Sequence, residues 1–290
     1  MRRRFGRGSD AADAERAAAA RREAELAALA EAVADEHCPG TGRVEPAVIA
    51  CTKGITTSLN DYGDAFDGML ECRAGRFHIY CNRTRGGDGD SARTRFTMAH
   101  ELGHYYIDEH RRALAAGRVA PHLSRCEHEC ALRVEREADL FAANLLMPAK
   151  RFRRAAKGVA PGMAGLITLA ERFGVSLSAA AIRYAALDIA PCAVVKWDWH
   201  GRAWKHVSAS GLRPFCRDMF ELPDQLAEDS PTRRALAREP TPEQGFFQAG
   251  TVAAAWFADV EQGEWRDAVF VEEAVPLGRY GVLSLLYPSA

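Results

Sequence analysis

The residues of this chain best suited to chemistry are two histidines and a glutamate in the segment FTMAHELGHYY. They form the pattern His-Glu-x-x-His at His100, Glu101 and His104. Positions four apart share one face of a helix, so a helix would place both histidines against one metal ion. Glu101 would then lie beside that ion, where a carboxylate can take a proton from a bound water. The spacing is that of a zinc hydrolase.

The alternative is a chance pattern on an amphipathic helix, with both histidines solvated, because short motifs recur in unrelated sequences. The residues around the motif argue against it. Much of the segment is apolar: Phe96, Met98, Ala99, Leu102, Gly103 and Ile107. A buried helix cannot hold two histidines and a carboxylate without groups that satisfy them. A metal ion would do so, and we expect Zn²⁺, with Mn²⁺ as a substitute.

A catalytic zinc needs a third protein ligand and one open position. An acid-rich helix predicted over 126–147 offers Glu127, Glu129, Glu135, Glu137 and Asp139. Glu135 and Asp139 are four apart, so we expect Glu135 to bind the metal and Asp139 to orient a ligating histidine. Glu137 lies about 200° around the helix from Glu135 and should point elsewhere. These acids could instead form a solvated face, but the apolar run at 140–143 favours ligation.

The segments RFTMAHELGHYYI and EREADLFAANLLMP resemble the ImmA/IrrE family of zinc metallopeptidases. The resemblance covers about residues 47–148 and extends into the helix pair that follows. On the family motif, the paired histidines fall on His100 and His104. The catalytic glutamate falls on Glu101 and the third ligand on Glu135. The resemblance implies a compact gluzincin-like core that cleaves a helix-turn-helix transcriptional repressor, releasing genes for stress response or for the transfer of mobile elements.

The segment between the two motifs departs from the family pattern. Cys126, His128 and Cys130 could hold a second metal or act as a redox switch. A structural role is favoured, because one cysteine pair without a second is weak evidence for zinc. His122, in the same segment, is a candidate for transition-state stabilisation.

The helices and strands that the sequence predicts around these residues indicate an α+β fold. Residues 68–72 and 76–81 alternate as two strands joined by a turn at Ala74 and Gly75. A site helix is predicted over 93–110, and residues 111–124 are expected to be less regular, with Gly117 and Pro121 breaking any long helix. An extended peptide substrate should add to the sheet beside the strand at 76–81.

Helices are also predicted on either side of this core. One is an exposed amphipathic helix at about 11–34. The other is a pair at 166–187, in which Gly174 stops the first helix and Ser176 or Ser178 caps the second. The second helix of the pair offers only Arg183 as a basic residue, so DNA binding is not favoured.

Four regions follow from this organisation. They are an N-terminal tail and helix (1–40), a mainly helical zincin-like core with a small β-sheet (41–157), a helix-turn-helix-like segment (158–190) and a β-containing C-terminal α/β domain (191–290). The last region should end in a strand at 278–287 and have a sensory or partner-binding role. Its aromatic residues are expected in its core: Trp197, Trp199, Trp204, Phe246, Phe247, Trp256 and Trp265.

Composition sets limits on function. The net charge is −1, so no overall charge bias directs the chain to nucleic acid or to a membrane. No segment has the length and apolar character of a membrane span, and residues 10–36 lack the apolar core of a signal peptide. We therefore expect a cytoplasmic protein whose eight cysteines are reduced.

Two hypotheses follow. The first is a zinc endopeptidase whose partner is a helix-turn-helix repressor. The second is a non-catalytic regulatory or DNA-binding protein in which the metal is structural. A structural zinc has four protein ligands, whereas a catalytic zinc keeps a water. Glu101 favours the enzyme, because a structural site needs no base there.

Overall fold

The structure is a computed structural model with an α+β fold, as predicted. It describes residues 7–40, 42–86, 89–118, 122–124, 133–201, 203–208, 225–256 and 267–289. The chain forms two compact units. The first comprises Met1–Arg151 and Phe173–Val175, and the second comprises Phe152–Arg172 and Ser176–Ala290. The four regions predicted from the sequence stay a prediction.

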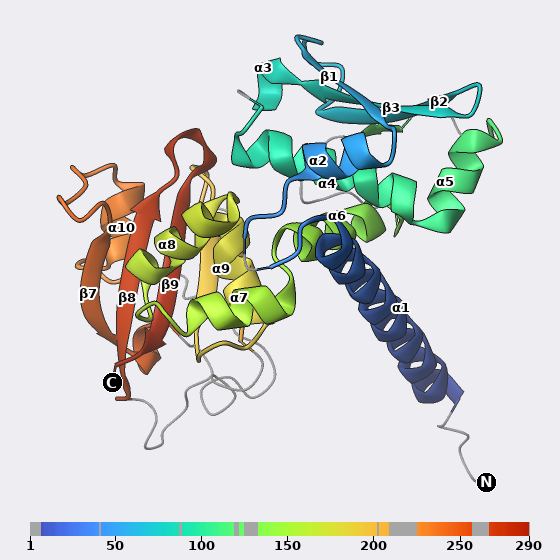
Figure 1. The fold of residues 1–290 in the computed structure, drawn as a ribbon. Helices are drawn as coiled ribbons and strands as arrows, with labels where there is room; N and C mark the ends of the chain where they lie inside the picture. The colour runs from blue at the N-terminus through green and yellow to red at the C-terminus, as the bar shows by residue number, and fades with distance from the viewer. Residues whose placement is uncertain are drawn as a thin grey trace, which may run out of the picture. The chain divides into compact units, whose positions relative to one another are not determined.

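Helices make up most of the first unit (Figure 1). They are α1 (Arg7–His37), α2 (Pro46–Thr52), α3 (Arg83–Gly86), α4 (Ala92–Tyr106), α5 (Asp108–Ala115) and α6 (Arg133–Leu146). The long helix α1 packs against α6. Leu26, Ala30, Val33 and Ala34 of α1 are buried, and their spacing places them on one helical face. The N-terminal helix is therefore part of the core around α6.

The sheet of the first unit has the strand order β1-β3-β2-β4. Its strands are β1 (Thr56–Asn60), β2 (Gly68–Arg73), β3 (Arg76–Asn82) and β4 (His122–Ser124). The predicted hairpin is confirmed: β2 and β3 pair antiparallel across Ala74 and Gly75, which both have positive φ.

The predicted docking of substrate beside β3 is wrong. β3 is a central strand, because β1 pairs with it in parallel on one side and β2 occupies the other. Among the described strands, β1 and β4 are the outer ones. Within the described sheet, the strands with an outer edge for an added peptide are therefore β1 and β4.

The site helix is shorter than predicted. α4 begins after Ser91, whose hydroxyl accepts a hydrogen bond from the backbone N–H of Thr94. It ends at Tyr106, because Ile107 is extended (φ −74°, ψ 110°) and buried. A new, short helix, α5, starts at Asp108 and ends at Ala115, so residues 111–115 are more regular than predicted. Gly117, which has φ +63°, follows its end, as the prediction of a break there requires.

A close helix crossing brings the two motifs together. α4 and α6 meet at Gly103, where an added Cβ would lie 3.1 Å from the Cα of Ala138 and 3.3 Å from a ring carbon of Phe141. Glycine removes the side chain that would separate the helices at this point. α6 is described from Arg133, so the first part of the helix predicted over 126–147 lies outside the described residues.

The second unit contains a five-stranded antiparallel sheet with the order β6-β5-β9-β8-β7. The strands are β5 (Ala193–Trp197), β6 (Ala203–Val207), β7 (Phe247–Val252), β8 (Val269–Pro276) and β9 (Val282–Pro288). Its helices are α8 (Met163–Phe173), α9 (Leu177–Ala186) and α10 (Pro231–Leu236). Single 3₁₀ turns lie at Ala253–Ala255 and Gly278–Tyr280. The boundary between the two units falls within α7 (Ala149–Ala156).

The final strand begins four residues later than predicted, at Val282. Gly281 precedes it with φ +95°, and an added Cβ there would lie 1.8 Å from the carbonyl oxygen of Trp197. This glycine lets the chain pass directly against β5 before the strand starts.

The helix pair has the predicted form. α8 and α9 are bent by 107° at a break where Gly174 has φ +62°. Ser176 caps α9 by accepting a hydrogen bond from the N–H of Ala179 at 3.2 Å. α9 packs on β5 and β6. Within the described chain, no single helix could cross a membrane by length and apolar character, and only this bent pair taken together meets both criteria.

Most of the described aromatic residues of the second unit are buried, as expected. Trp197, Trp256, Phe246 and Phe247 lie in the core, Trp199 and Trp204 are half-buried, and Trp265 lies outside the described residues. Two indole N–H groups donate to buried acceptors, Trp197 to Ser284 and Trp256 to Glu272. These residues thus hold the sheet together, and no ligand is needed to explain them.

Glu273 of β8 should make the stability of the second unit depend on pH. Its carboxylate accepts a hydrogen bond from the N–H of Met163 at 2.6 Å. Burial raises its pKa above the ordinary value of 4.5, and hydrogen bonds from Met163 and Tyr287 offset this in part. Because the folded-state pKa is raised, the free energy of unfolding should fall as pH rises from about 4.5 through that pKa.

Glu273→Gln should remove the fall in the free energy of unfolding with rising pH. The amide keeps an oxygen that can accept the hydrogen bond from the N–H of Met163. Thermal unfolding between about pH 5 and about pH 8 should show a smaller decrease in Tm for the variant than for the wild type. Glu171→Gln, at an exposed carboxyl of α8, is the control and should behave as the wild type. Equal pH dependence in the Glu273→Gln variant and the wild type would refute the assignment.

Candidate metal centre

Two helices present the three predicted ligands to one another. His100 and His104 come from α4, and their Nε2 atoms are 3.1 Å apart. Glu135 comes from the first turn of α6, with Oε2 3.1 Å from His100 Nε2 and Oε1 3.5 Å from His104 Nε2. All three side chains are buried. The structure thus brings together residues 35 positions apart, as the helix spacings predict.

The distances between these atoms fit a zinc ion. Zinc binds nitrogen and oxygen ligands at about 2.0–2.2 Å, so the ligand atoms of a tetrahedral site are about 3.3–3.6 Å apart. The observed separations of 3.1–3.5 Å lie near this range. Two imidazoles and a carboxylate are also a ligand set that zinc uses at catalytic sites. Within the described part of the chain, no fourth His, Cys, Asp or Glu joins this group.

Asp139 lies behind His100. Its Oδ1 is 2.8 Å from His100 Nδ1, so that nitrogen can donate its hydrogen to the carboxylate. Burial lowers the pKa of His100, but the hydrogen bonds that its ring donates to the carboxylates of Asp139 and Glu135 outweigh burial and raise the pKa to about 10. Asp139 thus points His100 Nε2 at Glu135, one turn earlier on α6. A metal would displace the proton from that nitrogen.

Glu101 is completely buried, and the start of β2 lies against it. An added Cβ on Gly68 would lie 2.7 Å from Glu101 Oε1 and 2.4 Å from the methyl group of Thr97. Glycine at this strand end therefore allows the sheet to approach the carboxylate. Burial, and then the charge of Glu101, raise the pKa of the Cys81 thiol to about 12, so Cys81 is a neutral neighbour.

Glu137 points away from the three ligands, as its offset on the helix predicts. Burial opposes its ionisation, but Arg22 and Arg133 lower the pKa of Glu137 to about 2. His110 lies between Glu137 and His104, and burial lowers its pKa. Arg22, Gly68 and His110 are not among the residues predicted from the sequence. Gly68 could have been noticed as a glycine at a strand end, whereas no local pattern links Arg22 to the site.

The roles predicted for residues in the segment before α6 are not tested by the structure. His122 lies in β4, but its side chain is not described. Cys126, His128 and Cys130 lie outside the described residues. Transition-state stabilisation by His122, and a second metal or redox switch at the cysteines, stay predictions.

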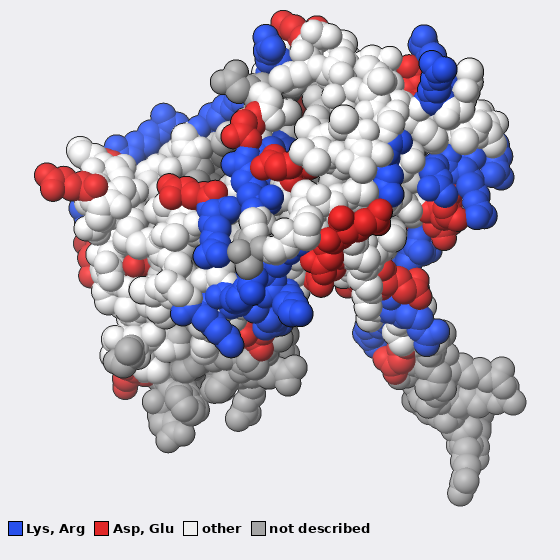
Figure 2. Space-filling model, viewed as in Figure 1, with Lys and Arg blue, Asp and Glu red and all other residues white. Residues whose placement is uncertain are grey.

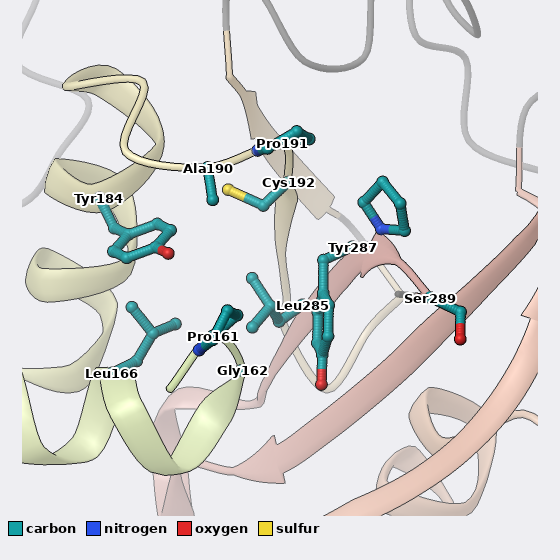
Figure 3. A pocket seen from close by; sticks show the side chains of 11 residues that line it. Pro161, Gly162, Leu166, Tyr184, Ala190, Pro191, Cys192, Leu285, Tyr287 and Ser289 are labelled. Carbon is teal, nitrogen blue, oxygen red and sulfur yellow. The ribbon is translucent and has the colours of Figure 1, made fainter. Parts of the chain in front are cut away.

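A separate cavity lies in the second unit (Figure 3). Its volume is about 220 Å³, which is smaller than the roughly 300–1,000 Å³ of ordinary ligand sites. Leu166 and Tyr184 of the helix pair line one side, and Leu285 and Tyr287 of β9 line another. Burial raises the pKa of the Cys192 thiol to about 12, with a smaller effect from Asp188. The described lining of the cavity is mainly apolar, and its cysteine is a neutral thiol.

The segment that contains the candidate metal centre is similar to a known protein family. Residues 88–184, about a third of the chain, match the model of the peptidase M78 family, described as an IrrE N-terminal-like domain. The match includes His100, Glu101, His104 and Glu135, and it confirms the resemblance found in the sequence.

A solved structure shares the fold. It is a Mycobacterium tuberculosis transcriptional regulator with a TM-score of 0.56 and 15% identity, and the alignment covers 90% of this chain and 86% of that one. No curated protein matches the sequence. The likeness in structure extends well beyond the segment that matches the family model.

Proposed function

We propose that the chain is a zinc-dependent endopeptidase, because residues 88–184 match the model of an IrrE N-terminal-like domain. One observation carries the proposal: the ligand atoms of His100, His104 and Glu135 all lie within 4.8 Å of one another. Glu101 follows His100 directly on the same helix. A ligand set with only three protein members leaves a position for water and substrate.

The chain's own residues divide the chemistry among them. A bound Zn²⁺ would supply a Lewis acid and lower the pKa of a water molecule. Glu101 takes the proton that the attacking water loses and passes it to the leaving amine. Asp139 keeps the ring of His100 in place while this happens. The buried surroundings of Glu101 strengthen its interaction with the developing charges.

The outer strand β4 is the proposed docking edge for the substrate, in place of β3. β4 pairs with β2 over Gly68–Leu70, and Gly68 is the residue that lies against Glu101. An extended peptide that adds to β4 on the side away from β2 would extend the part of the sheet that lies against the catalytic carboxylate. Backbone hydrogen bonds would then hold the scissile segment extended, with its side chains free to set specificity.

The substrate that the family resemblance favours is a helix-turn-helix transcriptional repressor. Its cleavage in the cytoplasm would release genes for stress response or for a mobile element. The solved structure with the same fold is called a transcriptional regulator, which agrees with a role in gene control. At 15% identity, that likeness supports the fold alone.

The competing proposal is a non-catalytic, metal-stabilised regulator that binds DNA. It needs a metal site closed by a fourth protein ligand, and the described residues supply three. Its recognition helix would be α9, where Ala180, Ala181, Tyr184 and Ala185 are buried. On the displayed face, Lys and Arg side chains gather in several groups, and Asp and Glu side chains lie beside them (Figure 2). The net charge of −1 gives the chain no overall attraction to a phosphate backbone.

The direct test starts from the neighbouring genes and uses a helix-turn-helix repressor that one of them encodes. The purified chain, loaded with zinc or manganese, should cut that repressor at one position, detected by intact-mass analysis. Chelation of the metal should stop the reaction, and returning zinc should restore it. An intact repressor after incubation with the loaded chain, together with retention of operator DNA by the chain at physiological salt, would support the regulator instead.

A further inference from the structure

A row of hydrogen-bonding side chains connects the metal centre to the N-terminal helix. We call His104, His110, Glu137 and Arg22 the His110 network. His104 Nδ1 is 3.2 Å from His110 Nδ1, and His110 Nε2 is 3.4 Å from Glu137 Oε2. Arg22 of α1 donates to both oxygens of Glu137, at 2.9 Å and 3.2 Å. The network joins residues from α1, α4, α5 and α6.

The chemistry of a ligating histidine dictates the direction of these hydrogen bonds. If His104 binds a metal through Nε2, its Nδ1 must carry the hydrogen and donate it. His110 Nδ1 must then be the acceptor, so the hydrogen of His110 sits on Nε2. That N–H points at the carboxylate of Glu137. Each atom in the row then has a complementary partner.

Glu137 is itself fixed from two sides. Arg133, one turn earlier on α6, donates to Oε1 at 2.9 Å, and Arg22 reaches the same carboxylate from α1. The side chain of Glu137 is 10% exposed, and that of Arg22 is 25% exposed. A carboxylate held by two guanidinium groups has little freedom to rotate. It can therefore hold the ring of His110 in one orientation.

The two ligating histidines are supported differently. His100 donates directly to a carboxylate, that of Asp139. His104 contacts the imidazole of His110, and His110 in turn contacts the carboxylate of Glu137. This second arrangement reaches outside the helix pair that carries the ligands. It makes the position of His104 depend on α1, which begins more than 80 residues before the motif.

We propose that His110, Glu137 and Arg22 are positioning residues that hold His104 in its metal-binding orientation, so that the N-terminal helix contributes to metal affinity. The proposal rests on the proposed function, because it needs a metal at His100, His104 and Glu135. None of the three residues touches the reacting atoms. They act through the ring of His104, as the partners of metal-binding histidines do elsewhere.

The test measures zinc affinity by competition with a chromophoric chelator, in the full chain. His110→Leu fills the space without an acceptor and should weaken zinc binding by about 10–100-fold. His110→Asn offers an oxygen near the place of Nδ1 and should recover part of that loss. Arg22→Ala should weaken binding by a smaller factor. Arg16→Ala, which removes an exposed arginine from the same helix, should leave zinc affinity unchanged.

A second readout separates positioning from general destabilisation. With Co²⁺ in place of zinc, His110→Leu and Arg22→Ala should change the visible absorption spectrum, and Arg16→Ala should not. Arg22→Ala also covers the case in which His110→Leu fails to fold, since Arg22 is on a partly exposed side of α1.

The outcomes distinguish this inference from the proposed function. A wild-type chain that binds no zinc would overturn both. A wild-type chain that binds zinc, with His110→Leu or Arg22→Ala variants that keep its affinity and cobalt spectrum, would overturn only the His110 network.

Discussion

Glu101→Gln is expected to abolish peptide cleavage and to leave metal binding intact. The amide keeps the shape of the carboxylate, so it should fit in the same buried space beside Gly68. It cannot accept a proton, and the loss of a general base costs about 10²–10⁴-fold in rate. Glu101 is not in the group of ligand atoms, so zinc affinity should stay within a small factor of the wild type.

The measurements are the cleavage rate of the adjacent repressor and the zinc content of the purified variant. Glu36→Gln, an exposed substitution on α1, serves as a control for the chemical change and should cleave normally. A Glu101→Gln variant that binds zinc and still cleaves at the wild-type rate would rule out Glu101 as the base. A variant that loses zinc would instead make Glu101 part of the metal site.

Local spacing was enough to predict the centre of the site. His100 and His104, and likewise Glu135 and Asp139, are four residues apart, and a helix turns that interval into a shared face wherever it lies. The crossing of the two helices at Gly103 then supplies the remaining geometry. These ligands can therefore be predicted from the two motifs alone, without knowledge of how the rest of the chain folds.

Features that depend on distant pairing could not be predicted in this way. β3 resembles an edge strand in the sequence, because nothing in residues 76–82 indicates that β1 pairs with it in parallel. The break at Ile107 arises because a buried apolar residue takes an extended conformation inside an otherwise helical segment. Arg22 meets Glu137 from 115 residues away. Contacts of this kind come from packing, and no period in the sequence reports them.

Glu135→Gln should remove tight zinc binding and, with it, activity. Glu135 is the one carboxylate among the three predicted ligands, so its negative charge would offset part of the charge of the ion. Its oxygens also lie near both imidazoles. A neutral amide is a weaker ligand for zinc. We expect zinc affinity to fall by more than about 100-fold, which is the upper end for residues that act only behind a ligand.

Thermal unfolding provides a measurement that does not depend on the substrate. A metal that binds only the folded state stabilises it by about 4 kcal/mol when its free concentration is a thousand times Kd. Saturating zinc should therefore raise the Tm of the first unit in the wild type and in Glu36→Gln, but only slightly in Glu135→Gln. If Glu135→Gln gained as much in Tm as the wild type, Glu135 would not be the third ligand. His122, Cys126, His128 and Cys130, in the segment before α6, would then be the next candidates for that ligand.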